Sequence, residues 1–202
     1  MPDAALPRIL VASDGRSAIP LPEPFLSATL LRDLDLATLA AVSGSAHPPQ
    51  AVDLDGIEGL AADHAGVRFV VETLGIRVVL TRRPAAAARV AELGGIGLVR
   101  VFAFDSTGLA RALETHPRAP RVGTVISPGP VLAHFTEDDL AALPGPVGAY
   151  GLISTVELAR PLLDRADMLV LRPEVAVALS TSTAGLPSTA GLPTLDIGRE
   201  RS

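Results

Sequence analysis

The sequence predicts a single α/β domain, a TIM-like (β/α) barrel that is abbreviated and irregular. Short apolar runs recur along the 202 residues, and Ala- and Leu-rich segments with helically spaced charges separate them. Continuous apolar runs suit strands that are buried on both faces of a parallel sheet. Their alternation with helices predicts βα units, and eight such runs favour closure into a barrel.

The predicted strands are the apolar runs at residues 8–12, 37–42, 52–54, 77–80, 98–102, 122–127, 147–149 and 168–171. The predicted helices between them cover residues 24–33, 59–74, 85–93, 107–116, 136–143 and 154–165. Asp105 and Ser106 are a plausible N-cap pair. Ser154, with Glu157 three residues later, has the spacing of a capping box.

One connection breaks this pattern. Only the nine residues SGSAHPPQA separate Val42 from Val52, whereas a crossover needs about a dozen residues. We therefore expect one crossover helix to be missing near residues 43–51, or one strand to be wrongly placed. Residues 1–179 would form the barrel. Residues 180–202, which repeat TAGLP, would form a flexible low-complexity tail.

Composition limits the function classes. The formal net charge is −5 and all 17 basic residues are Arg, which argues against a general electrostatic affinity for nucleic acid. Aromatic residues make up 3 % of the chain, which argues against a base-stacking surface. The chain has no Cys, no apolar run of about 18 residues and no signal-peptide pattern. We expect a cytoplasmic protein without a membrane partner.

Ligands of such barrels bind at the carboxyl ends of the strands. Asp53, Asp55 and Glu58 could bind a divalent cation there, or could be a solvated turn before a helix. Arg82, which follows Thr81, could hold a phosphate or carboxylate, or could be ion-paired at the surface.

Arg100 is unusual because it lies within an apolar run. A buried Arg needs an acidic partner, which a neighbouring strand could supply. Asp105 and Ser106 could bind ligand or simply cap the next helix. Gly129, Gly151 and Arg172 form a plausible anion cradle after the last strands.

Other chemistry has little support. The four His residues lack metal-ligand spacing, and His64 and His116 are interpreted as surface helix residues. The sequence contains no phosphate-loop motif and no nucleophile-elbow motif. The absence of Lys excludes a Schiff-base aldolase mechanism by this chain alone. We predict no cofactor and no resident metal.

Six strings carry a family resemblance: VDLDGIEGL at 52–60, VVLTRRP at 78–84, VRVFAFDSTGL at 99–109, VISPG at 125–129, GPVGAYGLIS at 145–154 and LVLRP at 169–173. In order and spacing they resemble the glycerol-3-phosphate-responsive antiterminators, also called glycerol uptake operon antiterminator regulatory proteins. The string R-x-F-x-x-D-S at 100–106 is the most specific part.

The resemblance implies a transcription regulator rather than an enzyme. Such a protein would sense glycerol 3-phosphate, or a similar phosphorylated metabolite, and act on leader mRNA. The resemblance implies these pocket residues: Asp53, Thr81, Arg82, Arg100, Asp105, Ser106, Gly129 and Gly151.

The chain departs from the family pattern at three places. Ala51 stands where the family usually has His, Tyr150 stands where it usually has the first Gly of a pair, and Leu171-Arg172 replace small hydroxyl residues. Tyr150 would crowd a phosphate or present its hydroxyl to it. Two alternatives stay open, an isomerase or lyase barrel using carboxylates or a metal, and a non-catalytic remnant barrel for protein interaction. A homo-oligomer is also possible.

Overall fold

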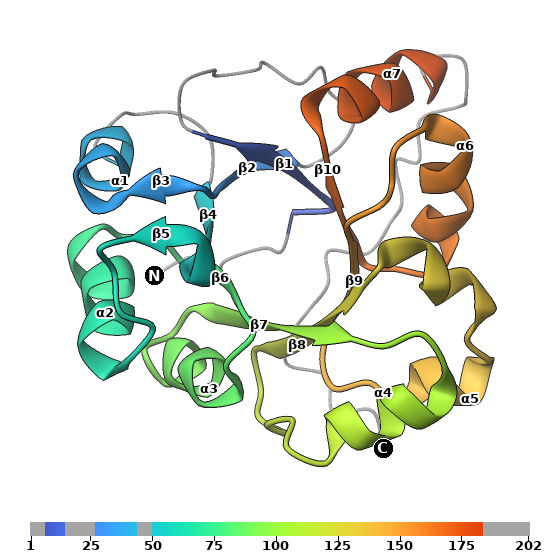
Figure 1. Cartoon of the computed structure of the whole chain (residues 1–202), viewed down its shortest axis with the longest axis horizontal. Helices are drawn as coiled ribbons and strands as arrows, with labels where there is room; N and C mark the ends of the chain where they lie inside the picture. The colour runs from blue at the N-terminus through green and yellow to red at the C-terminus, as the bar shows by residue number, and fades with distance from the viewer. Residues whose placement is uncertain (1–6, 15–26, 44–49, 184–202) are drawn as a thin grey trace.

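The computed structural model describes residues 7–14, 27–43 and 50–183. Eight parallel strands close into a barrel in the order β1-β10-β9-β8-β7-β6-β4-β2 (Figure 1). The barrel strands are β1 (Ile9–Ser13), β2 (Ser27–Leu31), β4 (Gln50–Asp53), β6 (Val78–Thr81), β7 (Ile96–Phe102), β8 (Val122–Ser127), β9 (Val147–Tyr150) and β10 (Met168–Leu171). The predicted α/β barrel is confirmed, and its described segments contain fewer helices than a full TIM barrel.

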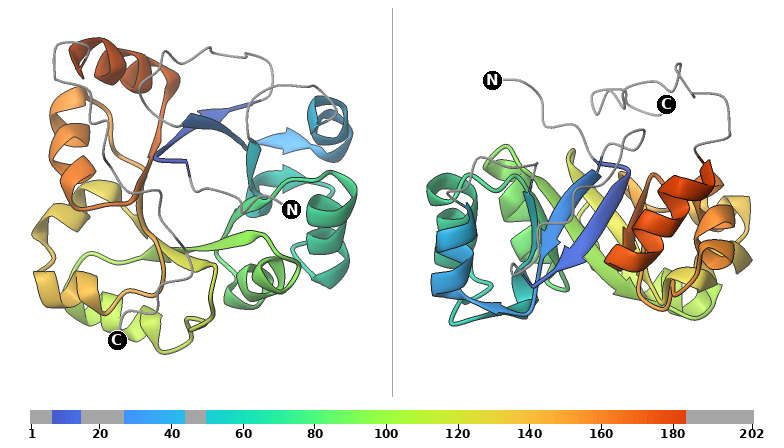
Figure 2. Two further views of the ribbon diagram at one scale, coloured as in Figure 1. Left: turned by 180° about the vertical axis from the view of Figure 1, so that it is seen from behind. Right: turned by 90° about the horizontal axis from the view of Figure 1, so that it is seen from above.

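Helices surround the strands on the outside (Figure 2). They are α1 (Leu36–Ser43), α2 (His64–Arg68), α3 (Pro84–Glu92), α4 (Ser106–Leu113), α5 (Glu137–Ala141), α6 (Val156–Ala159) and α7 (Pro173–Thr183). The 3-10 helices are η1 (Leu54–Gly56), η3 (Gly129–His134) and η4 (Arg160–Asp164), and η2 (Phe69–Thr73) is a π-helix that continues α2. A two-stranded parallel pair, β3 (Leu34–Asp35) and β5 (Ile57–Glu58), forms a separate sheet. No helix of these described segments is long and apolar enough to cross a bilayer.

Two elements were assigned wrongly from the sequence. The run at 37–42 is not a strand, because it belongs to helix α1. The predicted helix at 24–33 is also wrong, because β2 occupies its centre and buries Leu30 and Leu31. Ala and Leu are strong helix formers, so the Ala-rich run LATLAAVS favours a helix, whereas SATLL completes the barrel between β1 and β4.

These two errors explain the missing helix. The crossover from β2 to β4 contains the helix α1 at Leu36–Ser43. The helix that was expected to be missing near residues 43–51 is therefore the segment that had been assigned to a strand. Residues 44–49 are outside the described segments, as are residues 15–26 between β1 and β2. The other seven predicted strands are confirmed, with bounds that shift by no more than two residues.

The helix caps were predicted with mixed success. Asp105 caps α4, because its carboxylate accepts a hydrogen bond from the Gly108 amide at 2.7 Å. The cap of α6 is Thr155 rather than Ser154, so the capping box assigned to Ser154 is wrong by one residue. Helix α7 was not predicted, and it includes Ser180, the first residue of the expected tail. Residues 184–202 of that tail lie outside the described segments.

The core has an interior layer and an outer layer. The interior layer fills the barrel with one cluster: Leu10, Ala28, Leu30, Ala51, Val78, Leu80, Ile96, Leu98, Val125, Met168 and Val170. The outer layer lies between strands and helices and is formed by two further clusters. A filled interior leaves the carboxyl ends of the strands as the place for polar chemistry.

Candidate ligand-binding site

Three polar side chains continue the interior layer at the carboxyl ends of their strands. Successive residues of a strand point to opposite faces, so Arg100 of β7 faces the same way as the interior residue Leu98. By the same alternation, Asp53 of β4 faces inward like Ala51. Tyr150 of β9 packs against the interior cluster. Because all the strands are parallel, these three side chains meet at one end of the barrel, which we call the mouth.

Arg100 and Asp53 form an ion pair at the mouth. Arg100 Nη1 donates a hydrogen bond to Asp53 Oδ2 at 3.1 Å, and the two side chains are 16 % and 4 % exposed. The prediction that Arg100 has an acidic partner is therefore confirmed. That partner comes from β4, which is separated from β7 by β6 rather than adjacent to it.

The Asp53 carboxylate is not fully satisfied by this pair. Its Oδ1 atom is buried and has no hydrogen-bond partner among the described residues. Burial raises the pKa of Asp53, and the charge of Asp55 adds to the rise, whereas Arg100 and Arg32 oppose it. A buried carboxylate oxygen without a donor favours a ligand hydroxyl or a water as its missing partner.

Tyr150 lies between two guanidinium groups. The Cζ atoms of Arg100 and Arg32 are 5.1 Å and 5.7 Å from the centroid of its ring, within the range of cation–π contact. Arg32 Nη1 also donates a hydrogen bond to the Tyr150 hydroxyl, and Arg32 Nε donates to Asp33 Oδ2 at 2.6 Å. The Tyr150 side chain thus contacts Arg residues from two separate strands of the barrel.

Sequence reasoning missed Arg32, because it placed residues 24–33 in a helix. A signal was present. Arg32 follows an apolar run in the string Leu-Leu-Arg-Asp, and Arg82 follows another in the similar string Leu-Thr-Arg-Arg. In both cases an Arg directly follows a buried strand.

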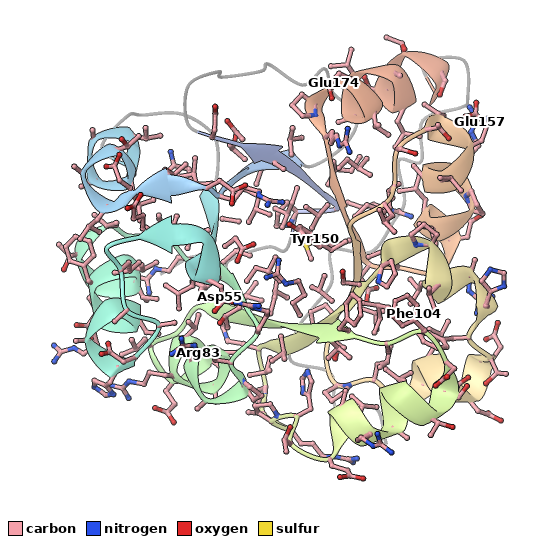
Figure 3. All side chains as sticks on the ribbon, viewed as in Figure 1. Asp55, Arg83, Phe104, Tyr150, Glu157 and Glu174 are labelled. Atoms are coloured by element: carbon pink, nitrogen blue, oxygen red, sulfur yellow. The ribbon has the colours of Figure 1, made fainter. Side chains whose placement is uncertain are left out.

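A second polar cluster surrounds Asp55 near the ends of β4 and β6 (Figure 3). The Asp55 carboxylate accepts hydrogen bonds from the Arg82 amide at 2.5 Å and from Thr81 Oγ1 at 3.3 Å. The Nε atoms of Arg82 and Arg83 lie 3.5 Å and 3.8 Å from it. Asp55 is 5 % exposed, whereas the two Arg side chains are 67 % and 64 % exposed. The ion-paired interpretation of Arg82 is therefore confirmed, and Arg83 shares the same partner. A ligand role for Thr81 and Arg82 stays a prediction.

Asp105 and Ser106 have local partners. Asp105 caps α4, and Ser106 Oγ donates a hydrogen bond to Asp139 Oδ2 at 2.9 Å, which connects α4 to the first turn of α5. The capping interpretation is confirmed for Asp105. A ligand role for either residue remains a prediction.

The three residues of the predicted anion cradle have distinct local surroundings. The Gly129 amide donates to the Gly151 carbonyl at 3.0 Å, so that amide is already used. Gly151 has φ +76°, a conformation that glycine adopts easily, but helix α6 begins only at Val156. Arg172 is exposed at the end of β10. The role of these three residues in ligand binding stays a prediction.

Asp53, Asp55 and Glu58, the three acidic residues considered as a metal site, do not form one cluster. Asp53 is paired with Arg100, whereas Glu58 is exposed on β5. Within residues 7–14, 27–43 and 50–183, no group of three or more His, Cys, Asp or Glu could hold a metal ion.

One His was also assigned wrongly. His116 is buried rather than on a helix surface, and its Nε2 lies 3.1 Å from Thr124 Oγ1. Burial lowers the pKa of His116, and backbone hydrogen bonds to Pro117 and Gly123 oppose that shift only in part.

Comparison with known proteins gives a consistent result. The family model of the glycerol-3-phosphate responsive antiterminators matches residues 26–185. The crystal structure of a glycerol uptake operon antiterminator regulatory protein from Listeria monocytogenes is similar, with TM-score 0.68 and 16 % identity over 86 % of this chain and 95 % of that chain. A glycerol uptake operon antiterminator-related protein from Thermotoga maritima is similar with TM-score 0.65 and 21 % identity over 86 % and 97 % of the two chains.

At these identities the solved structures establish the shared fold alone. No curated protein sequence matches this chain. The family model, by contrast, spans most of the chain, including β2 with Arg32 and every later strand of the barrel. The chain therefore belongs to the family of glycerol-3-phosphate responsive antiterminators.

Proposed function

We propose that this protein is a metabolite-sensing regulator that binds glycerol 3-phosphate, or a similar small phosphorylated polyol, at the mouth of the barrel. One observation carries the proposal: the side chains of Arg32 and Arg100 meet at the mouth beside Asp53 Oδ1, a buried oxygen that has no donor among the described residues. Family membership supports the same ligand class.

The chemistry of the mouth suits the two ends of such a ligand. The planar guanidinium group of Arg places several N–H donors where they match the oxygens of a phosphate. Arg32 is more exposed than Arg100, with side-chain exposures of 33 % and 16 %. The hydroxyl groups of a polyol can donate to Asp53 Oδ1, which has no other donor among the described residues. A phosphate held by Arg32 and a hydroxyl held by Asp53 would fix the orientation of the ligand.

Calorimetric titration of the full chain with glycerol 3-phosphate tests the proposal. Arg32→Gln should weaken binding by about tenfold or more, because a hydrogen bond to a charged group contributes about 1.5–3 kcal/mol. Arg68→Gln is a matched control, since Arg68 is exposed and ion-paired on α2, away from the mouth. Absence of heat at millimolar ligand, with the protein folded, would contradict the proposal.

We further propose that the regulatory output acts on single-stranded leader mRNA through the same end of the barrel. Phe102 and Phe104 are both exposed at the end of β7, with ring centroids 4.9 Å apart, and exposed aromatic rings can stack on bases. The exposed guanidinium groups of Arg82 and Arg83 follow the neighbouring strand β6. These local features offset the low aromatic content and the negative net charge of the whole chain.

Fluorescence anisotropy with a labelled leader RNA of a glycerol uptake operon, with and without glycerol 3-phosphate, tests this part. We expect ligand-dependent binding that Phe102→Ala weakens by about tenfold, as loss of one stacked base would. Val177→Ala is the control, since Val177 is an exposed apolar residue on α7. RNA binding that is absent under both conditions, or unchanged in Phe102→Ala, would contradict it.

A further inference from the structure

Resting on the proposed function, we propose that Tyr150 is a built-in competitor for the ligand. Its phenol occupies the place between Arg32 and Arg100 where the anionic group of the ligand would bind, and it must rotate away before that group can reach Arg32. Tyr150 would therefore set both the affinity of the site and its selectivity for highly charged ligands.

The position of the ring carries this proposal. Arg32 follows β2 and Arg100 lies on β7, two strands that β4 and β6 separate along one side of the barrel. The Tyr150 ring contacts both guanidinium groups, at 5.7 Å and 5.1 Å. A single side chain therefore bridges the mouth, and Figure 3 shows Tyr150 near the centre of the barrel.

Three of the guanidinium nitrogens that could bind an anion already donate to other groups. Arg32 Nη1 donates to the Tyr150 hydroxyl and Arg32 Nε donates to Asp33. Arg100 Nη1 donates to Asp53. A phosphate group that approaches Arg32 therefore competes with the phenol for Nη1. A hydrogen bond from a guanidinium to a phosphate joins two opposite charges, whereas the bond from Arg32 to the phenol joins a charge to a neutral oxygen. A dianion can therefore displace the phenol, whereas a neutral polyol cannot.

The displacement needs only a side-chain rotation. Tyr150 is the last residue of β9 and its partner across the ladder is Val170 of β10. The side chain is only half-buried, so it can turn toward solvent without separating the two strands. The following backbone is tied down, because the Gly151 carbonyl accepts a hydrogen bond from the Gly129 amide.

The chain carries its own reporter for this motion. Tyr150 is the sole Tyr of the sequence, which has no Trp. Tyrosine emission of the full-length protein therefore comes from this side chain alone. It can be followed during titration with glycerol 3-phosphate and, separately, with inorganic phosphate.

The experiment combines this emission with calorimetry on the wild type, Tyr150→Phe and Tyr150→Ala. We expect the wild-type emission to change with the same midpoint as the heat. Tyr150→Phe should bind about threefold more tightly, because it keeps the ring but removes the competing hydroxyl. Tyr150→Ala should also bind more tightly, because it removes both the ring and the competing hydroxyl. Arg68→Gln should behave as the wild type does.

The outcomes that overturn the proposal are separate from those that overturn the ligand function. Wild-type binding with unchanged emission would mean that Tyr150 stays in place. Weaker binding by Tyr150→Phe would mean that the hydroxyl contacts the ligand directly. Either result would be compatible with ligand binding at the mouth but would overturn the proposal that Tyr150 competes with the ligand. Absence of heat for all three proteins would instead overturn the ligand function, and the competitor with it.

Discussion

Removing one partner of the Arg100–Asp53 pair should strongly destabilise the barrel. In Arg100→Leu, the Asp53 carboxylate keeps its buried position, at 4 % exposure, but loses the donor to Oδ2, and Oδ1 has none among the described residues. Loss of one partner of a buried pair costs about 3–5 kcal/mol. This cost is a large fraction of the free energy of unfolding of a typical protein, which is about 5–15 kcal/mol.

The pH dependence of this cost has a definite sign. Burial already raises the pKa of Asp53, and Arg100 is the charge that opposes the rise most. Without Arg100 the folded-state pKa rises further above the unfolded value of about 3.9. The folded state then binds more protons than the unfolded state, so stability falls as pH rises through the interval between the two values. The defect of Arg100→Leu should therefore be largest near neutral pH and smaller in acid.

Urea unfolding of the wild type, Arg100→Leu and the double variant Arg100→Leu/Asp53→Leu measures both effects. At about pH 7 the single variant should lose about 3–5 kcal/mol, and at about pH 5 it should lose less. The double variant should be closer to the wild type than the single variant is, because neither charge is left buried and unpaired. A single variant that loses less than about 1 kcal/mol, or a double variant as unstable as the single, would refute this reasoning.

Three further predictions concern other parts of the fold. Burial lowers the pKa of His116, so the unfolded state binds more protons and stability should fall as pH drops below about 6.5. Urea unfolding of His116→Gln should show a weaker dependence of stability on pH in that range. An unchanged pH dependence would contradict the burial of a neutral His116. Gly97→Ala would place a Cβ 2.1 Å from the Ala87 carbonyl oxygen of α3, so thermal unfolding should show a loss of about 1–3 kcal/mol, and wild-type stability would count against this close approach. Leu152 is 72 % exposed and has φ +58°, a backbone conformation that glycine adopts at lower cost than Leu. Leu152→Gly should therefore stabilise the protein by about 0.5 kcal/mol in urea unfolding. A loss of stability would show that contacts of the Leu side chain outweigh the cost of its backbone conformation.

Most of the barrel could be predicted because each strand is a short segment that is buried on both faces. Such a segment is mostly or wholly apolar, as in MLVL of β10. The incorrect assignments fall at residues 27–43, where two apolar segments lie close together in the sequence. SATLL became β2 and LATLAAVS became α1, and only barrel closure decides between them.

The candidate site could be predicted in part for the same reason. Arg100 stood out because an Arg inside an apolar strand requires a partner, and Asp53 stood out at the end of such a strand. Arg32 did not stand out, because its strand had been assigned to a helix. The competing capping roles of Asp105 and Ser106 became visible only from their hydrogen bonds.

The sequence by itself determined that the chain forms parallel strands and that an inward Arg must be neutralised within the fold, because burial and alternation act along each segment. Only the tertiary structure decided which residues meet. Asp53 reaches Arg100 across β6, and Arg32 and Arg100 converge on Tyr150 from separate strands. These contacts depend on closure of the barrel, which brings together strand ends that are far apart in sequence, and no local pattern encodes their distance.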